Sequence, residues 1–270
     1  MKEYRDFLNK LLKTVRNELL TKYRDPYYLK VTGRGAGGDP TLLIDKVSED
    51  VIVEGVREAF PDCTIVSEER GIEDIGRGGP PYVVIDPLDG SVNATRGYLR
   101  FSISIAIAEG ERLKDVKAGA VIDVRTSDFF EAYEGFGLFV NGRRAKASNV
   151  NRLEEALVSV PVTHYARTGN LDLVIPLLRS ARRVRSLGST SLEVSYVGAG
   201  ALDAMVDLSG RARNVDIAAA YLMVKEGGGV ITDEELGELD VSLKGINGLS
   251  FIAASNLDLA RSILSHIRSE

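Results

Sequence analysis

Hydrophobic residues recur at helical spacing near the start of the chain. The spacing predicts an amphipathic helix over residues 4–22 and a second helix over residues 41–60. Asp25-Pro26 ends the first helix, because a proline restricts the residue before it to extended conformations. Residues 33–40 hold four glycines and predict no regular structure. We interpret this segment as a mobile loop near the functional site.

The middle of the chain has the pattern of strands. Residues 101–108 alternate with a period of two, which is typical of a strand with one buried face. Shorter apolar runs, separated by glycine or polar turns, predict strands at residues 64–66, 83–85, 119–124, 128–133 and 138–140. Asn141-Gly142 is typical of a hairpin turn. The short connections predict an antiparallel sheet.

Beyond residue 150, strands and helices alternate. Strands are predicted at residues 156–160, around Val184, and at residues 202–207, 229–232 and 249–254. Helices are predicted at residues 171–180, 191–198 and 217–226, with a last helix capped by Asn256. Such alternation is typical of an α/β layer. We therefore divide the chain into an N-terminal α+β half, residues 1–150, and a C-terminal α/β half, residues 151–270.

Composition narrows the class of protein. A hydrophobic content of 44% and a charged content of 27% are typical of a soluble globular protein. No apolar run approaches the roughly 20 residues that cross a bilayer, and the net charge of −5 argues against a general nucleic-acid surface. Cys63 is the only cysteine and fits a reducing compartment. We expect a cytoplasmic protein without a nucleic-acid partner or membrane association.

The candidate chemistry centres on residues 83–93, where an apolar run leads into a turn that carries Asp86 and Asp89. Pro87 restricts its neighbour, and Gly90 allows backbone conformations that other residues avoid. The amides after Asp89 can then face an anion. Carboxylates for a hard cation beside amides for a phosphate are typical of a metal-assisted phosphatase. The alternative is that the aspartates serve turn chemistry alone.

Three further acids have equally plain structural explanations. Asp45 lies in the first turn of a predicted helix, where an acid complements the helix dipole. Glu68 follows a short strand, where glutamate is usually solvated, although a glycine-rich return could bring this strand end to Asp86. Asp216 opens the helix predicted at residues 217–226, where an acid often serves as a cap. Taken singly, none of these three residues identifies a site.

Their combination is specific. Ser67-Glu68-Glu69, the run from Asp86 to Asn93, and Asp216-x-Ala-Ala followed by Glu226-Gly-Gly-Gly resemble the inositol monophosphatase family of magnesium-dependent, lithium-sensitive sugar phosphatases. Pro40-Thr41-x-x-x-Asp45 and Gly188-Ser189-Thr190 resemble its first motif and its substrate-contacting turn. The likeness is closest to archaeal enzymes that act on both inositol monophosphate and fructose 1,6-bisphosphate. Val215 departs from the family's aromatic residue, and Ser91 stands where many members have threonine.

The resemblance implies a layered α-β-α-β-α sandwich of mixed α+β and α/β character, a homodimer, and a site between the two halves. The N-terminal half would carry most metal ligands, and the C-terminal half Asp216 and the substrate contacts. The implied ligand sets are Glu68, Asp86 and the Leu88 carbonyl for one Mg²⁺, and Asp86, Asp89 and Asp216 for a second. A weaker third ion would lie near Asp45 and Glu68. Mn²⁺ is expected as a substitute and Li⁺ as an inhibitor.

The expected reaction is direct attack of metal-activated water on a phosphomonoester. Glu68 and Ser91 would orient the water and receive its proton, with Asp45 as a further catalytic candidate, while the Gly90 and Ser91 amides hold the phosphate. We expect a small sugar-phosphate substrate and release of the 1-phosphate of fructose 1,6-bisphosphate. The candidates for substrate binding are Asp89, Gly90, Ser91, Tyr165, Arg167, Arg183, Arg185, Gly188 and Ser189. Because arginine binds phosphate bidentately, the arginines among them would hold the second phosphate.

Alternatives remain open at this point. Arginines before the Gly188 turn could form a solvated basic face, which we prefer for Arg179 and Arg182. A 3′(2′),5′-bisphosphate nucleotidase or an NADP phosphatase could use the same scaffold, but it would need an adenine slot, for which Tyr165 is the aromatic candidate. A non-catalytic regulator that binds Mg²⁺ or a sugar phosphate would lack a ligand, and this sequence lacks none.

Overall fold

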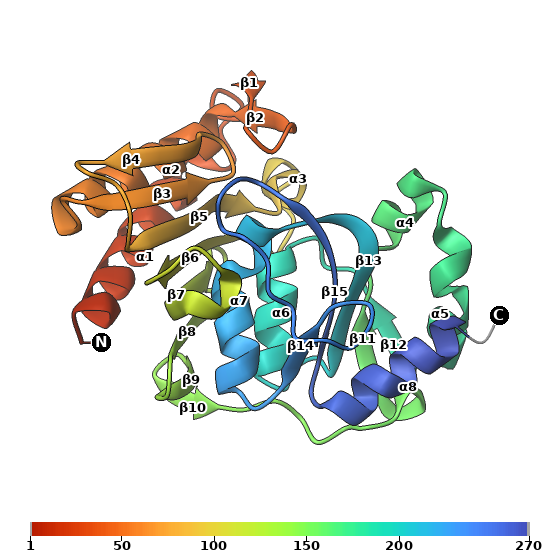
Figure 1. Ribbon diagram of the computed structural model, residues 1–270. Coiled ribbons are helices and arrows are strands. Elements are labelled where there is room, and N and C mark those ends of the chain that lie inside the picture. Colours follow the sequence, from red (N-terminus) through yellow and green to blue (C-terminus); the bar gives the residue numbers. More distant parts are fainter. Residues whose placement is uncertain (1, 269–270) are drawn as a thin grey trace.

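The computed structural model describes residues 2–268 (Figure 1). It confirms the two N-terminal helices as α1 (Lys2–Lys22) and α2 (Leu43–Ala59). Between them, β1 (Val31–Arg34) and β2 (Pro40–Leu42) pair as an antiparallel hairpin. The expectation of no regular structure over residues 33–40 is therefore wrong. The glycines lie at the strand end and in the turn, where Gly38 adopts a φ of 89° and lets the chain reverse.

An eight-stranded sheet follows, in the order β10-β9-β8-β7-β6-β5-β3-β4. Its strands are β3 (Cys63–Ser67), β4 (Gly71–Ile75), β5 (Tyr82–Asp89), β6 (Ser102–Ala108), β7 (Val116–Asp123), β8 (Phe129–Tyr133), β9 (Gly137–Val140) and β10 (Arg143–Ala145). Neighbours are antiparallel, as predicted, except that β3 and β5 run parallel. Their register pairs Ser67 with Ile85, so Glu68, the residue after β3, lies beside Asp86 of β5.

The second sheet has five strands in the order β12-β11-β13-β15-β14. They are β11 (Leu157–Ser159), β12 (Arg183–Arg185), β13 (Ala204–Arg213), β14 (Val230–Thr232) and β15 (Gly248–Ala254). Strand β11 is parallel to β12 and β13, and the other neighbours are antiparallel. The chain passes from the first sheet to the second between Ala145 and Leu157, which contains the boundary predicted at residue 150.

The remaining helices are α3 (Ser91–Thr95), α4 (Val162–Thr168), α5 (Ile175–Ser180), α6 (Thr190–Gly198), α7 (Asn214–Glu226) and α8 (Leu257–Arg268). Single 3₁₀ turns occupy Leu113–Asp115, Leu153–Glu155 and Leu171–Val174. The helix predicted over residues 171–180 is thus divided, because Pro176 begins α5 within its first turn. Helix α4 was not expected.

The elements stack as the predicted α-β-α-β-α sandwich (Figure 1). Helices α1 and α2 cover one face of the eight-stranded sheet, α6 and α7 lie between the two sheets, and α5 and α8 cover the outer face of the second sheet. Eleven of the 13 residues of α7 are buried, which explains its apolar composition on all sides. The central core joins residues of both halves, so the two halves share one interior.

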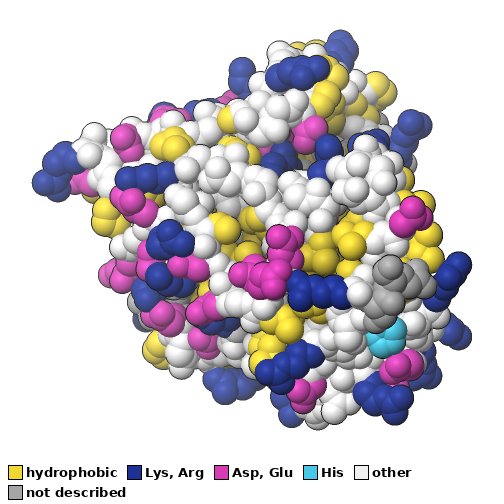
Figure 2. Space-filling model, turned by 45° about the vertical axis from the view of Figure 1, so that its right-hand side comes forward, with side chains coloured by type: hydrophobic (Ala, Val, Ile, Leu, Met, Phe, Trp, Pro, Cys, Tyr) yellow, Lys and Arg dark blue, Asp and Glu magenta, His cyan; other side chains and the backbone are white. Residues whose placement is uncertain are grey.

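The surface mixes basic and acidic side chains on the face that Figure 2 shows. Among residues 2–268, no helix is long and apolar enough to cross a bilayer.

Candidate active site

A cavity of about 850 Å³ opens between the two halves. The ends of β3 and β5 contribute Glu68 and Asp86, and the starts of α6 and α7 contribute Thr190 and Asp216. The turn of the β1–β2 hairpin and one face of α4 also line it. A volume of this size is typical of a site for a small molecule.

Three carboxylates meet in this cavity. Glu68, Asp86 and Asp216 each offer an oxygen, and these atoms lie within 4.8 Å of one another. The parallel pairing of β3 with β5 brings the first two together. Asp216 is fixed by its own helix, because Oδ2 accepts the backbone N–H of Arg213 at 2.9 Å. Behind them, Ser48 Oγ donates to the Pro87 carbonyl at 2.6 Å and ties α2 to the β5 turn.

Burial and mutual repulsion raise the pKa values of all three acids. Burial raises the pKa of Asp216 to about 7, although Arg213 opposes the change. Burial and the charges of Glu68, Asp89 and Asp216 raise the pKa of Asp86 well above its usual range. Burial also raises the pKa of Glu68. A set of converging carboxylate oxygens fits a hard divalent cation, which would offset this repulsion.

Asp45 adds a fourth buried acid, 3% exposed, near this group. Its Oδ2 accepts the backbone N–H of Leu42 at 2.7 Å, the helix-start contact considered as its structural explanation. Its buried Oδ1 has no hydrogen-bond partner among residues 2–268. Burial, followed by the charges of Glu69 and Glu68, raises the pKa of Asp45 to about 8. An orphaned buried carboxylate oxygen is the kind of atom that a nearby cation satisfies.

Asp89 joins the two halves of the molecule. Its Oδ2 accepts hydrogen bonds from the backbone N–H of Ser191 at 2.7 Å, from the Ser191 hydroxyl at 2.6 Å and from the Ser189 hydroxyl at 2.7 Å. It lines the cavity but does not belong to the group of three carboxylates. Its part in metal binding stays a prediction. Ser189 is fully buried, and its hydroxyl donates to Asp89. Its side chain therefore does not face the cavity, contrary to the substrate contact predicted for it.

The turn after β5 shapes one wall of the cavity. Gly90 precedes α3 with a φ of 87°, and an added Cβ would lie 2.8 Å from the carbonyl oxygen of Gly188, so only glycine fits. Asn93 Nδ2 donates to the carbonyls of Arg100 at 2.7 Å and Leu187 at 2.8 Å. Leu88, Ser91 and Gly188 line the same wall. The predicted phosphate and metal contacts thus lie along one surface.

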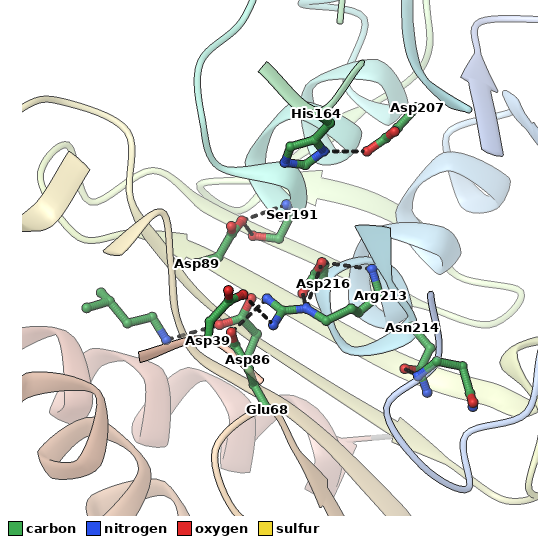
Figure 3. A network of polar contacts seen from close by, with 12 residues as sticks. Asp39, Glu68, Asp86, Asp89, His164, Ser191, Asp207, Arg213, Asn214 and Asp216 are labelled. Atoms are coloured by element: carbon green, nitrogen blue, oxygen red, sulfur yellow. Dashed lines mark hydrogen bonds and ion pairs between the residues drawn. The ribbon is translucent and has the colours of Figure 1, made fainter. Parts of the chain in front are cut away.

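Arg213 was not expected at the site. It is the last residue of β13, and its guanidinium reaches into the acidic group (Figure 3). Nη2 lies 2.7 Å from Glu68 Oε1, Nε lies 3.1 Å from Asp216 Oδ1, and Nη1 lies 3.4 Å from Asp39 Oδ2 on the hairpin turn. The hairpin also docks by its backbone, because the N–H groups of Ala36 and Gly37 donate to the carbonyls of Glu69 and Glu68.

Comparison with known proteins identifies the group to which this chain belongs. Residues 1–269 match the sequence pattern described as the inositol monophosphatase family. The chain belongs to that family. A fructose-1,6-bisphosphatase/inositol-1-monophosphatase of Methanothermobacter thermautotrophicus is 38% identical over 241 residues, which are 85% of this chain and 84% of that protein. The family confirms the phosphatase class predicted from the motifs.

Two other relatives bear on the fold and the activity. A solved inositol monophosphatase-fructose 1,6 bisphosphatase superposes with a TM-score of 0.83 at 31% identity, covering 97% of this chain and 98% of that one. A bifunctional NADP phosphatase/NAD kinase of Methanococcus maripaludis is 31% identical over 83% of this chain, but the match spans only 42% of that longer protein. The layered fold predicted from the motifs is therefore confirmed.

Among the described residues, three basic side chains besides Arg213 line the cavity. His164 and Arg167 lie one helical turn apart on α4, and Arg211 lies on β13. His164 Nδ1 lies 3.0 Å from Oδ2 of the fully buried Asp207, and Figure 3 shows this pair well away from Glu68. A single histidine in a short polar segment gives no sign of this placement in the sequence.

The predicted substrate contacts around α4 and β12 need correction. Tyr165 is fully buried, and its hydroxyl accepts the Leu208 N–H at 2.6 Å, so it packs in the core and does not face the cavity. Arg183 and Arg185 are exposed on β12, and each guanidinium donates to a neighbouring backbone carbonyl, that of Arg182 or Val184. Neither arginine is among the described residues that line the cavity. Their placement therefore gives no support to the second-phosphate role predicted for them.

Proposed function

We propose that this chain is a Mg²⁺-dependent phosphomonoesterase that removes the 1-phosphate of fructose 1,6-bisphosphate and also hydrolyses inositol monophosphate. The observation that carries the proposal is the convergence of Glu68, Asp86 and Asp216 in a cavity large enough for a sugar phosphate. Relatives that span most of the chain bear both activities in their names. Hard oxygen donors without a soft ligand favour Mg²⁺, with Mn²⁺ as a substitute.

The residues take the following roles in this proposal. Two to three Mg²⁺ ions would be held by Glu68, Asp86, the Leu88 carbonyl, Asp89 and Asp216, with Asp45 contributing to the weakest. When bound, they would supply an activated water nucleophile and neutralise charge on the leaving oxygen. Glu68 lies at the edge of this group of carboxylates, where it could accept a proton from the nucleophile. Ser91 orients the nucleophile, and the Gly90 and Ser91 amides hold the phosphate.

The basic side chains of the cavity suit the part of the substrate that lies beyond the scissile phosphate. Arg167 and Arg211 line the cavity, and His164 is oriented toward it by the buried Asp207. A second phosphate carries negative charge and accepts several hydrogen bonds, so it would gain most from these side chains. Inositol monophosphate would leave the arginines solvated. These residues take over the part that the sequence first suggested for Arg183 and Arg185.

A second candidate is an NADP phosphatase, and the 31% identity to the Methanococcus maripaludis protein favours it. In that case, these basic side chains would bind the nucleotide's pyrophosphate in place of a sugar phosphate. With Tyr165 buried in the core, the cavity offers no aromatic platform from that position for an adenine ring. We therefore rank this activity second.

Phosphate release from four compounds with Mg²⁺ separates the candidates: fructose 1,6-bisphosphate, inositol 1-phosphate, NADP⁺ and 3′-phosphoadenosine 5′-phosphate. We expect the first two to be hydrolysed fastest and the Asp86→Asn variant to be inactive on all four, which excludes a contaminating phosphatase. Preferential hydrolysis of NADP⁺ would overturn the ranking. From the resemblance to this family we also propose that the protein is a homodimer, and light scattering after gel filtration would measure its mass in solution. We further propose that it is located in the cytoplasm.

A further inference from the structure

We propose that Arg213 is a built-in cation that contends with the metal for Glu68 and Asp216, and thereby sets how tightly the site binds a divalent ion. The inference goes beyond the proposed function but rests on its metal site. It concerns binding of the ion itself and needs no particular substrate.

The contacts of Arg213 carry this inference. Its Nε donates to Asp216 Oδ1 at 3.1 Å, while its backbone N–H donates to Asp216 Oδ2 at 2.9 Å. Both oxygens of one candidate ligand are thus engaged by the same residue. Its Nη2 forms an ion pair with Glu68 Oε1 at 2.7 Å. Two of the three converging carboxylates therefore already have a cationic partner in this fold (Figure 3).

Local structure holds the guanidinium in that position. Arg213 joins β13 directly to α7, and its side chain is only 19% exposed. Gly37 lies against it, because a Cβ at that position would be 2.5 Å from Arg213 Nη1. Asp39 on the same hairpin turn completes the pairing at 3.4 Å. The hairpin, the end of β3 and the start of α7 thus share this one side chain.

A guanidinium and a divalent ion cannot both use these oxygens without cost. The guanidinium already pairs with Glu68 Oε1 and Asp216 Oδ1, and it would repel a divalent ion held by the same two carboxylates at such short range. Ion binding must therefore displace the guanidinium from at least one of these two carboxylates. Part of the attraction between the acids and the ion is offset in this way, and the affinity is lower than the acids alone would give.

The sign of the effect separates this role from a purely structural one. If Arg213 merely supported the ligands, its removal would disorder them and weaken metal binding. If it contends with the ion, its removal strengthens binding and lowers stability only when no ion is present. Arg211 supplies the matched control, because it lines the same cavity two residues earlier and no ion pair joins it to an acid within residues 2–268.

The test is titration of the full chain with Mn²⁺ alone, without substrate, at a pH of about 8, which is above the usual pKa of carboxylates and is kept the same for every variant. We expect Arg213→Met to lower the dissociation constant about tenfold, the effect of one charge-assisted hydrogen bond. Arg213→Lys should fall between this variant and the wild type, and Arg211→Met should change it less than about twofold. Unchanged or weaker binding by Arg213→Met overturns the proposal, whereas absence of Mn²⁺ binding by the wild type overturns the metal site itself.

A second measurement needs no variant. Phenylglyoxal modifies accessible arginines, and peptide mass spectrometry follows Arg213 and Arg211 separately in the wild-type protein. We expect saturating Mn²⁺ to speed modification of Arg213 relative to Arg211, because the ion displaces its guanidinium from the carboxylates. Slower or unchanged modification of Arg213 would overturn the proposal even if the variants failed to fold.

Discussion

Replacing Asp89 by asparagine separates the two tasks of this side chain. Its Oδ2 accepts three hydrogen bonds at 2.6–2.7 Å from the start of α6, and its charge raises the pKa values of Glu68, Asp86 and Asp216. The asparagine oxygen can keep those three hydrogen bonds. The substitution therefore removes a negative charge from the cavity while leaving the contact between the two halves in place.

The structure sets the expected magnitudes. Loss of one electrostatic stabiliser costs about 10²-fold or more in kcat/KM. The folding stability of Asp89→Asn should stay within about 1 kcal/mol of the wild type, because weaker hydrogen bonds are offset by reduced repulsion among the acids. Asp89→Ala removes the acceptor altogether and leaves the buried Ser191 N–H unpaired, so it should also lose about 1–3 kcal/mol.

The assay is phosphate release from fructose 1,6-bisphosphate and inositol 1-phosphate at saturating Mg²⁺, with thermal unfolding measured on the same samples. Ser191→Ala is the matched control, because it removes one hydrogen bond to Asp89 and keeps the charge. Its activity should fall far less than that of Asp89→Asn. Near wild-type turnover by Asp89→Asn would refute the assignment of Asp89 to metal and substrate binding.

Three further outcomes are expected. Arg167→Ala should raise KM for fructose 1,6-bisphosphate roughly tenfold and barely change KM for inositol 1-phosphate, whereas the exposed Arg179→Ala should change neither; equal effects on both substrates would contradict the second-phosphate role. In EDTA, thermal stability should fall as pH rises from about 4 to 8, because folding raises the pKa of Asp216 to about 7 and that of Asp45 to about 8. The stability that these two groups contribute is complete below their unfolded pKa and is lost as pH rises through their folded pKa. Thermal stability that rises over this window would refute the prediction. Hydrogen exchange across residues 33–40 should slow when Mg²⁺ and product are added, and equal protection in both states would exclude closure.

The sequence predicted those elements whose side-chain pattern is strong. Helices α1 and α2 have continuous apolar faces, and the strands of the first sheet are separated by clear turns. Short exposed strands escaped prediction, because β1, β4 and β10 lie at sheet edges or in a hairpin and bury too little to impose a pattern. Tyr165 was misplaced for a related reason, since nothing in its polar surroundings indicates that its ring enters the core.

The candidate site was predictable where a motif holds several of its residues together. The run from Asp86 to Asn93 is of that kind. Arg213 was not, because its partners Glu68 and Asp39 lie 145 and 174 residues away in the sequence. They meet only because α7 packs against β5 and the hairpin is bonded to the end of β3. The pairing of His164 with Asp207 likewise arises from α4 packing beside β13.

The acids themselves explain why structural and functional explanations could not be separated from sequence. Asp45 accepts the N–H at the start of α2, Asp216 that at the start of α7, Asp86 Oδ1 that of Leu88 at 3.1 Å, and Asp89 that of Ser191. Each carboxylate thus uses one oxygen to hold nearby backbone, as an ordinary cap or turn residue would. The second oxygen is then held in a fixed direction, which a metal site requires before any ion arrives. The cap and the ligand are therefore two uses of the same side chain.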